Sequence, residues 1–337
     1  MNSTPPSKRS IGWLAAVVLP LVVVVASFGV LRYAVAGSIP FVRTGDPQES
    51  NPFAKRAPFV DPAAPVAQAA VNAASPEDRK VLKRMAKVPA GLWLTPEKLP
   101  VGNIGAYVSQ LASQAAAANQ VPVFVIYGIT DRDCGSESAG GLPADQYLPW
   151  VSEITKALKD ADDAVAIVEP DALALADKCG DLPQRTALIK GAVDLLVAAR
   201  VVTYVDAAHS DWIGAANMAA RLKAVGIETT RGFATNVSNY YGNSQERTYA
   251  LELSQALGGS HFVIDSGRNG AGSSGEWCNP SGRALGIEPG YVDDGSAQDA
   301  YLWVKPPGES DGACNGGPAA GSWWTEGAVA LARQAGW

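Results

Sequence analysis

Short apolar runs alternate with stretches of helical periodicity along most of this chain. The apolar runs are rich in β-branched and aromatic residues, which are typical of buried strands. Strands are predicted over residues 91–94, 122–127, 164–168, 201–205, 232–235, 261–264 and 300–304. Helices are predicted over residues 105–119, 144–159, 182–199, 217–225, 244–257 and 323–334. Continuous apolar strands separated by helices indicate a parallel α/β sheet covered on both faces, and seven such units favour a closed or nearly closed barrel.

The N-terminus has a different pattern. Two basic residues precede an uncharged apolar run over residues 10–31, which at ~20 residues is long enough to cross a bilayer as a helix. Small residues at 34–36 resemble a signal-peptide cleavage site, but the run exceeds the ~7–15 residues of a signal-peptide core, which favours an uncleaved anchor. We expect a protein outside the cytoplasm, either anchored in the membrane by residues 10–31 or secreted after cleavage near Ala36.

The chain therefore divides into three parts. Residues 1–36 form the signal anchor or signal peptide. Residues 37–74 are rich in proline and alanine and are predicted to be a linker or extended arm, of which the part from about residue 50 packs on the domain. Residues 75–337 are predicted to form the folded α/β domain, beginning at Ser75, an N-cap residue that is followed by a proline and two acids.

Charge and cysteine content narrow the function classes. A net charge of −6, with 33 acidic and 27 basic residues interspersed, argues against a nucleic-acid partner. The four cysteines lie in the exported part, where disulfides persist, and form no motif typical of a metal site, so we expect no metal and no cofactor. Three pairings are possible. Pairing in chain order, Cys134–Cys179 and Cys278–Cys314, closes the shorter loops and is our working prediction.

Polar and aromatic residues directly follow almost every predicted strand. They lie in the stretches 127–133, 169–171, 206–209, 236–239, 265–268 and 305–311. The carboxyl ends of all strands face the same rim of an α/β barrel, so these side chains converge. The pattern predicts an active site at that rim.

At these stretches the chain resembles glycoside hydrolase family 6, the inverting cellulases. The matching motifs include Ile167-Val-Glu-Pro-Asp-Ala-Leu173, Tyr204-Val-Asp-Ala-Ala-His-Ser-Asp-Trp212 and Trp303-Val-Lys-Pro-Pro-Gly-Glu-Ser-Asp-Gly312. The similarity runs from about residue 50 to the end. It implies a distorted, incompletely closed parallel α/β barrel of about seven strands, two disulfides in a pattern like the chain-order pairing, and hydrolysis of β-1,4-glucosidic bonds.

The resemblance also assigns the acids. An inverting glycosidase uses an acid and a base ~6.5–9.5 Å apart, with room for a water. Asp171 matches the general acid, whose proton is retained through burial and neighbouring acids. Asp133 matches the residue that keeps this acid protonated, and Asp311 matches the candidate base. The alternatives are that Asp171 only caps the next helix, that Asp133 only pairs with Arg132, and that Asp311 lies in a solvated loop.

The remaining matched residues are predicted to bind sugar. They are Tyr127, Asp206, His209, Trp212, Asn236, Trp277, Lys305 and Glu309. A tryptophan face gives broad contact with the C–H face of a sugar ring. One departure from the family pattern is Ala215, where many members have a second tryptophan.

The segments near residue 180 and over 280–300 are short and leave no room for two long loops that roof a tunnel. We therefore expect an open cleft, endo-acting cleavage of cellulose or a related β-glucan, and a monomer. The alternatives are a catalytically idle carbohydrate-binding protein on the same barrel and a hydrolase of a different cell-wall glycan.

Overall fold

The computed structural model describes residues 1, 45–159, 161 and 164–337. Its sheet has eight strands in the order β1-β2-β3-β4-β5-β6-β8-β7, all parallel except β7, which pairs antiparallel with β8. The strands are β1 (Leu92–Leu94), β2 (Val123–Ile126), β3 (Val165–Val168), β4 (Val202–Asp206), β5 (Gly232–Thr235), β6 (His261–Asp265), β7 (Gly290–Tyr291) and β8 (Gln298–Leu302). The seven predicted strands and their parallel arrangement are confirmed, and the two-residue β7 is an addition at the edge.

The barrel is left incompletely closed at a seam between β1 and β8. Two hydrogen bonds cross this seam beyond the end of β8: the Gly91 N–H donates to the Trp303 carbonyl (2.9 Å), and Trp93 Nε1 donates to the Val304 carbonyl (2.8 Å). Within the described ranges, these contacts replace a β1–β8 ladder. The predicted distorted, incompletely closed barrel is therefore confirmed.

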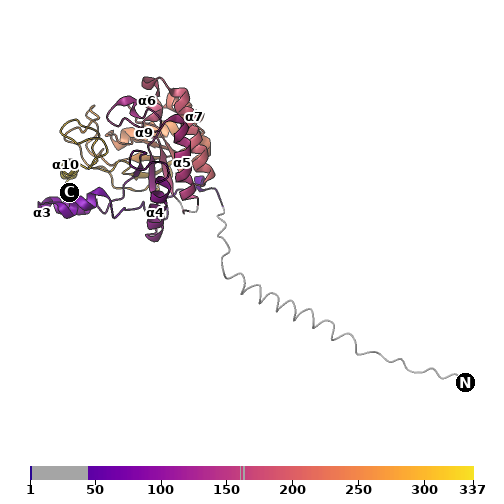
Figure 1. Cartoon of the computed structure of the whole chain (residues 1–337), viewed down its shortest axis with the longest axis horizontal. Helices are drawn as coiled ribbons and strands as arrows, with labels where there is room; N and C mark the ends of the chain where they lie inside the picture. Colours follow the sequence, from indigo (N-terminus) through magenta and orange to yellow (C-terminus); the bar gives the residue numbers. More distant parts are fainter. Residues whose placement is uncertain (2–44, 160, 162–163) are drawn as a thin grey trace. The chain divides into compact units, whose positions relative to one another are not determined.

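Helices cover the outside of the sheet. They are α2 (Pro65–Asn72), α3 (Pro76–Met85), α4 (Ile104–Ala117), α5 (Ala144–Leu158), α6 (Ala172–Cys179), α7 (Leu182–Ala198), α8 (Ala215–Ala224), α9 (Asn243–Ala256) and α10 (Thr325–Gln334). In Figure 1, α4, α5 and α7 lie next to one another on one side of the domain, and α3 lies beside α10. The sequence analysis missed α2 and α6. It gave no range to a helix directly after Asp171, where an alanine- and leucine-rich stretch forms the largely buried α6.

Both faces of the sheet are apolar, as a covered parallel sheet requires. In β2, Val123 and Val125 face the barrel interior, while Phe124 and Ile126 pack outward against the helices. The other parallel strands continue this alternation. The strand ends are thereby held rigidly, which fixes the direction of the polar residues that follow them.

The described part of the predicted linker or arm packs on the barrel. Phe53 and Phe59 are 4% exposed, and Gln48 donates from Nε2 to the Val201 carbonyl (2.7 Å). Helix α2 lies within the same stretch and packs on α3. The predicted anchor over residues 10–31 lies outside the described residues. Among those that are described, no helix is both long and apolar enough to span a bilayer.

Two disulfides, Cys134–Cys179 and Cys278–Cys314, confirm the pairing in chain order. The first joins the loop after β2 to the end of α6, and the second joins the loops after β6 and β8. Disulfides persist in oxidising compartments, which indicates that this domain folds outside the cytoplasm.

Candidate active site

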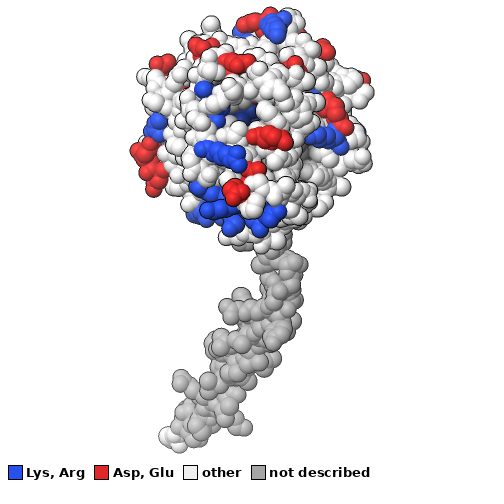
Figure 2. Space-filling view, turned by 90° about the vertical axis from the view of Figure 1, so that its left-hand side faces the viewer, with Lys and Arg blue, Asp and Glu red and all other residues white. Residues whose placement is uncertain are grey.

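A cleft of about 960 Å³ lies at the carboxyl ends of the strands. Nine of the eleven predicted site residues line it: Tyr127, Asp133, Asp171, His209, Trp212, Trp277, Lys305, Glu309 and Asp311. The predicted convergence of strand ends on one site is therefore observed. Figure 2 shows a hollow on one face of the domain, with acidic and basic side chains around it.

Asp171 stands between β3 and α6 with an uncommon backbone conformation, φ 67°. Its N–H donates to Asp206 Oδ2 (2.9 Å), while its own Oδ1 is buried and has no hydrogen-bond partner among the described residues. Its side chain does not cap α6, which argues against the purely structural alternative. Burial, and then the charges of Asp206 and Asp133, raise the pKa of Asp171 well above its ordinary value. This carboxyl therefore favours its protonated form.

Asp206 lies beneath the cleft rather than on its wall. It is 2% exposed, and its Oδ2 accepts from the backbone N–H groups of Asp171 (2.9 Å) and Ala208 (3.0 Å). Burial raises the pKa of Asp206 to about 7, against these two hydrogen bonds, which lower it. Asp206 is predicted from the resemblance to bind sugar, but the structure places it against Asp171 and outside the lining of the cleft.

Asn236 is also buried and does not line the cleft. Its Nδ2 donates to the carbonyls of Tyr241 (3.0 Å) and Asp265 (2.9 Å), and its Oδ1 accepts from the Tyr241 N–H (3.1 Å). The amide is therefore used within the protein to shape the turn after β5. A direct contact between Asn236 and sugar, as predicted from the resemblance, is not available in this arrangement.

Asp133 faces the cleft from the loop after β2. Its Oδ2 accepts from the Ser138 N–H (2.8 Å), and it lies in a left-handed turn at φ 59°. The neighbouring disulfide Cys134–Cys179 ties this loop to the helix that begins after Asp171. The covalent link keeps the two acids within electrostatic reach of each other.

Arg132 does not pair with Asp133. Its guanidinium forms an ion pair with Glu97 (3.2 Å), donates to the Tyr127 carbonyl (2.7 Å) and lies 4.5 Å from the centre of the Tyr127 ring. The alternative that Asp133 serves only as the partner of Arg132 is therefore wrong.

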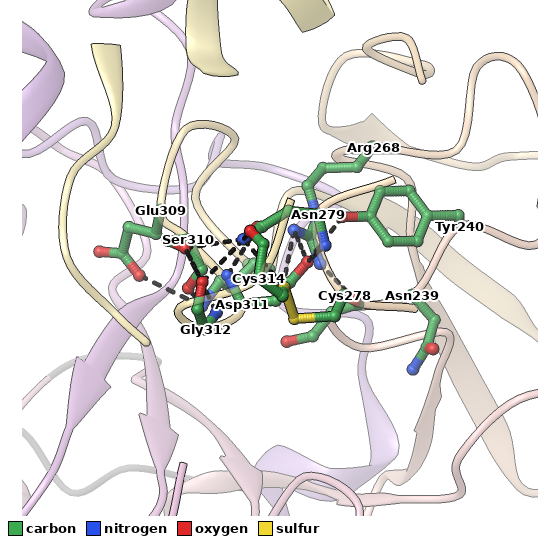
Figure 3. A network of polar contacts seen from close by, with 12 residues as sticks. Asn239, Tyr240, Arg268, Cys278, Asn279, Glu309, Ser310, Asp311, Gly312 and Cys314 are labelled. Atoms are coloured by element: carbon green, nitrogen blue, oxygen red, sulfur yellow. Dashed lines mark hydrogen bonds and ion pairs between the residues drawn. A yellow bond between two sulfur atoms is a disulfide. The ribbon is translucent and has the colours of Figure 1, made fainter. Parts of the chain in front are cut away.

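Asp311 is surrounded by donors, as Figure 3 shows. Its Oδ2 accepts from the Tyr240 hydroxyl (2.7 Å), from Arg268 Nη1 (2.9 Å) and from the Asn279 N–H (3.0 Å). Arg268 also lies 2.8 Å from Oδ1. Asp311 is 8% exposed, so it does not lie in a solvated loop. The set of donors stabilises its charged form.

The sequence analysis missed Tyr240, Arg268 and Asn279 as partners of Asp311. Tyr240 lies next to the polar stretch 236–239 and Arg268 lies within the stretch 265–268, so a signal was present for these two residues. Asn279 lies further along the loop after β6, outside the stretches that were singled out. All three residues are 32 to 71 positions away from Asp311 in the sequence. The periodicity of apolar residues gives no information about contacts between positions so far apart.

Lys305 and Glu309 lie on the same wall as Asp311. Lys305 Nζ is 3.7 Å from Glu309 Oε2 and 5.4 Å from the centre of the Trp93 ring. Burial raises the pKa of Glu309, with the charge of Lys305 acting in the opposite direction. Below them Asp265, another residue missed from sequence, accepts four backbone N–H bonds and joins the ends of β6 and β8 to the loop after β5.

The aromatic residues differ in exposure. Trp212 and Trp277 are 38% and 53% exposed, which is unusual for large apolar side chains. Tyr127 is buried against Trp93, with ring centres 5.1 Å apart, and burial raises its pKa. His209 stacks on Tyr241 (4.3 Å, 18° between planes), and burial lowers its pKa to about 4, so the ring is neutral at physiological pH.

One contact joins the two walls of the cleft. Glu137, in the loop after β2, accepts from the Ala313 N–H through Oε2 (3.0 Å). The sequence analysis expected an open cleft, because the segments near residue 180 and over 280–300 are short. A single side chain nevertheless spans the distance between the loops that carry Asp133 and Asp311.

Comparison with known proteins agrees with this geometry. The family model described as glycosyl hydrolases family 6 matches residues 53–335. Endoglucanase A of Cellulomonas fimi is 43% identical over 86% of this chain and 63% of its own length, and endoglucanase A of Thermobispora bispora is 38% identical over 75% and 58%. This chain thus spans less than two thirds of these relatives.

A solved structure gives the same result. The endoglucanase Cel6 from Mycobacterium tuberculosis superimposes with a TM-score of 0.81 at 42% identity, covering 86% of this chain and 100% of that one. The family match covers every residue that lines the acid centre. On this evidence, the chain belongs to glycosyl hydrolase family 6.

Proposed function

We propose that this chain hydrolyses β-1,4-glucosidic bonds of cellulose or a related β-glucan with inversion, at internal positions of the polymer. The observation that carries this proposal is the buried Oδ1 of Asp171, which has no hydrogen-bond partner within the described ranges and lies in a cleft lined by the exposed Trp212 and Trp277. Endoglucanase names among the relatives support the endo mode. The Mycobacterium tuberculosis relative was solved with methyl-cellobiosyl-4-deoxy-4-thio-beta-D-cellobioside, which supports the substrate class.

In the proposed reaction, Asp171 gives its proton to the glycosidic oxygen while the bond from C1 to that oxygen breaks. A water attacks C1 from the opposite face and loses one proton. The C1 product keeps the hydroxyl of this water, the leaving sugar keeps the proton of Asp171, and the proton lost by the water restores protonated Asp171 through the solvent. Asp133 contributes negative charge that keeps Asp171 protonated until the sugar arrives. Asp311 supplies a fixed negative charge for the developing positive charge on the ring, and accepts the proton of the water directly or through further water.

The cleft walls support the assignment of binding residues. Trp212 and Trp277 present exposed faces on which glucose rings stack. Lys305 and Glu309 are placed to bind sugar hydroxyls, and neutral His209 and Tyr127 add hydrogen-bonding groups at the rim. For Asp206 and Asn236 we propose a positioning role beneath the cleft in place of direct sugar binding.

The product anomer tests the proposal. Proton NMR of cellotetraose hydrolysis should show α-anomeric reducing ends first, and Asp171→Asn should abolish their release. Initial β-anomers would contradict inversion. Binding without turnover of β-1,4, mixed-linkage or other cell-wall glycans would favour the idle carbohydrate-binding alternative.

For localisation and assembly, we propose a monomer that acts outside the cytoplasm, with residues 10–31 as its membrane anchor and cleavage near Ala36 as the alternative. The disulfides support the compartment. N-terminal sequencing of the mature protein separates the two forms, because a secreted form would begin near residue 37. Sedimentation analysis tests the monomer.

A further inference from the structure

Four buried polar atoms behind the acid have no hydrogen-bond partner among the described residues. They are Asp206 Oδ1, Ser210 Oγ, Thr235 Oγ1 and Glu246 Oε2, from the ends of β4 and β5, the loop after β4 and the first turn of α9. Asp206, Thr235 and Glu246 are at most 2% exposed. Buried polar atoms are almost always paired, so four without partners in one region call for an explanation.

Glu246 reaches this region from α9 and supports the loop after β4 from below. Its Oε1 accepts from the N–H of Ser210, close to His209 and Trp212 in the same loop (2.9 Å). Asp206 holds the start of this loop through the second of its two backbone hydrogen bonds. Two carboxyl groups thus lie under one short loop, and neither of them lines the cleft.

The surroundings of this pair are acidic. Burial raises the pKa of Asp206 most, and the charges of Glu246 and Asp265 raise it further. Asp206 in turn acts on the pKa of Asp171. Within the described ranges no salt bridge reaches Asp206 or Glu246. Interacting buried acids do not both ionise readily at neutral pH, so one proton stays with the pair.

Two tyrosine hydroxyls near Glu246 are engaged elsewhere. Tyr249 donates to the Ala207 carbonyl (3.0 Å), and Tyr241 donates to Asp211 Oδ2 (3.0 Å). Both tyrosines lie within electrostatic reach of Glu246. Neither hydroxyl donates to Glu246 Oε2, which therefore has to be satisfied within the pair and its immediate neighbours.

The number of donors indicates which carboxyl holds the proton. Asp206 Oδ2 accepts two backbone N–H bonds, from Asp171 and Ala208, whereas Glu246 accepts one. Donors favour the charged form of a carboxyl, so the negative charge belongs on Asp206 and the proton on Glu246 Oε2. Burial also raises the pKa of Glu246. A protonated carboxyl is itself a donor, which supplies one of the unpaired acceptors with a partner.

We propose that Glu246 is a positioning residue for the acid, which holds a proton in the resting protein and thereby keeps Asp206 a carboxylate against the Asp171 N–H. This inference rests on the proposed function, because it concerns how Asp171 retains the proton that it gives to the glycosidic oxygen. Glu246 lies outside the lining of the cleft. It acts on the reaction through the charge of Asp206, so its contribution appears in the pH dependence of catalysis.

Two substitutions separate the proton on Glu246 from its other contacts. Glu246→Gln keeps an acceptor for the Ser210 N–H and a neutral donor, so kcat/KM on cellotetraose should keep its pH profile. Glu246→Leu removes both, so that Asp206 takes up the proton and no longer raises the pKa of Asp171. Activity requires protonated Asp171, so the alkaline limb should move to lower pH, and kcat/KM there should fall about tenfold. Glu252→Leu, at an exposed position on α9, is the matched control.

A double variant tests whether Glu246 acts through Asp206. Glu246→Leu added to Asp206→Asn should move the alkaline limb no further than Asp206→Asn alone, because the charge through which Glu246 acts is already gone. A further shift equal to that of Glu246→Leu in the wild-type background would overturn this route.

Carboxyl ¹³C NMR of glutamate-labelled wild-type protein reads the proton directly, with Glu246→Gln to assign the resonance, and decides the proposal even if Glu246→Leu does not fold. The Glu246 resonance should keep the chemical shift of a protonated carboxyl at neutral pH. An ionised Glu246 at neutral pH, or an alkaline limb that moves equally in both single variants or in neither, would overturn the proposal. Absence of cellotetraose turnover in the wild type would instead refute the proposed function, whereas a protonated Glu246 in the same sample would show that the buried pair is correctly described.

Discussion

Two aspartates on the same rim have opposite surroundings. Asp171 has a buried oxygen without a partner among the described residues, and further acids lie around it. Asp311, on the opposite wall, is held by an arginine, a tyrosine hydroxyl and a backbone N–H. The first environment favours a neutral acid that can donate a proton, and the second favours a fixed anion.

The difference lies in the neighbours and not in the residue type. Both aspartates follow a strand, and both are close to a disulfide. The β4 strand places Asp206 next to Asp171, whereas the loops after β5 and β6 place Tyr240 and Arg268 next to Asp311. The strand ends that lie beside each aspartate in the barrel therefore determine that Asp171 is the acid and Asp311 the anion.

The largest effect is expected for Asp171→Asn, which removes the proton donor while preserving shape. General acid catalysis contributes about 10²–10⁴-fold, so kcat on cellotetraose should fall by this factor. Asp194→Asn, at an exposed position on α7, serves as the control. Equal activity of Asp171→Asn and this control would refute the assignment of the acid.

Arg268→Met should mainly affect stability. It leaves Asp311 buried without its ion-pair partner, which costs about 3–5 kcal/mol in the free energy of unfolding. Urea denaturation measures the loss. Adding Asp311→Asn removes the uncompensated charge and should restore part of that free energy. No recovery in the double variant would show that Arg268 supports the fold independently of Asp311.

Tyr240→Phe removes a single donor from Asp311 and tests the same cluster more gently. A hydrogen bond to a charged group contributes about 1.5–3 kcal/mol, so the variant should unfold at a lower urea concentration but remain folded. Tyr107→Phe, at an exposed position on α4, provides the matched control. A loss no greater than in the control would mean that the hydroxyl does not stabilise the anion.

The smallest effect is expected for Asp206→Asn, which keeps an acceptor for the Asp171 N–H but removes a charge. The Asp206 anion raises the pKa of Asp171, so its removal lowers that pKa. Activity requires protonated Asp171 and is lost as pH rises through its pKa. The alkaline limb of kcat/KM should therefore move to lower pH in the variant. Movement to higher pH would contradict this coupling.

Periodicity predicted the seven parallel strands because each carries apolar residues on both faces, as in Val123 to Ile126. It missed α2, which lies in a proline- and alanine-rich stretch that lacks the composition of a core helix. In the site, the position of a residue directly after a predicted strand identified the residues at the rim. It did not indicate whether a side chain lines the cleft or lies beneath it. Asp206 and Asn236 follow strands like Asp171, yet lie beneath the cleft because their side chains bond to neighbouring backbone.

The central claim is that Asp171 is neutral in the resting protein near neutral pH. It can be tested by ¹³C NMR of aspartate-labelled protein, with Asp171→Asn to assign the carboxyl resonance. The structure predicts that this resonance keeps the chemical shift of a protonated carboxyl well above the ordinary pKa range of aspartate. A resonance that titrates within the ordinary range would contradict the account, since Asp171 would then have no proton to donate.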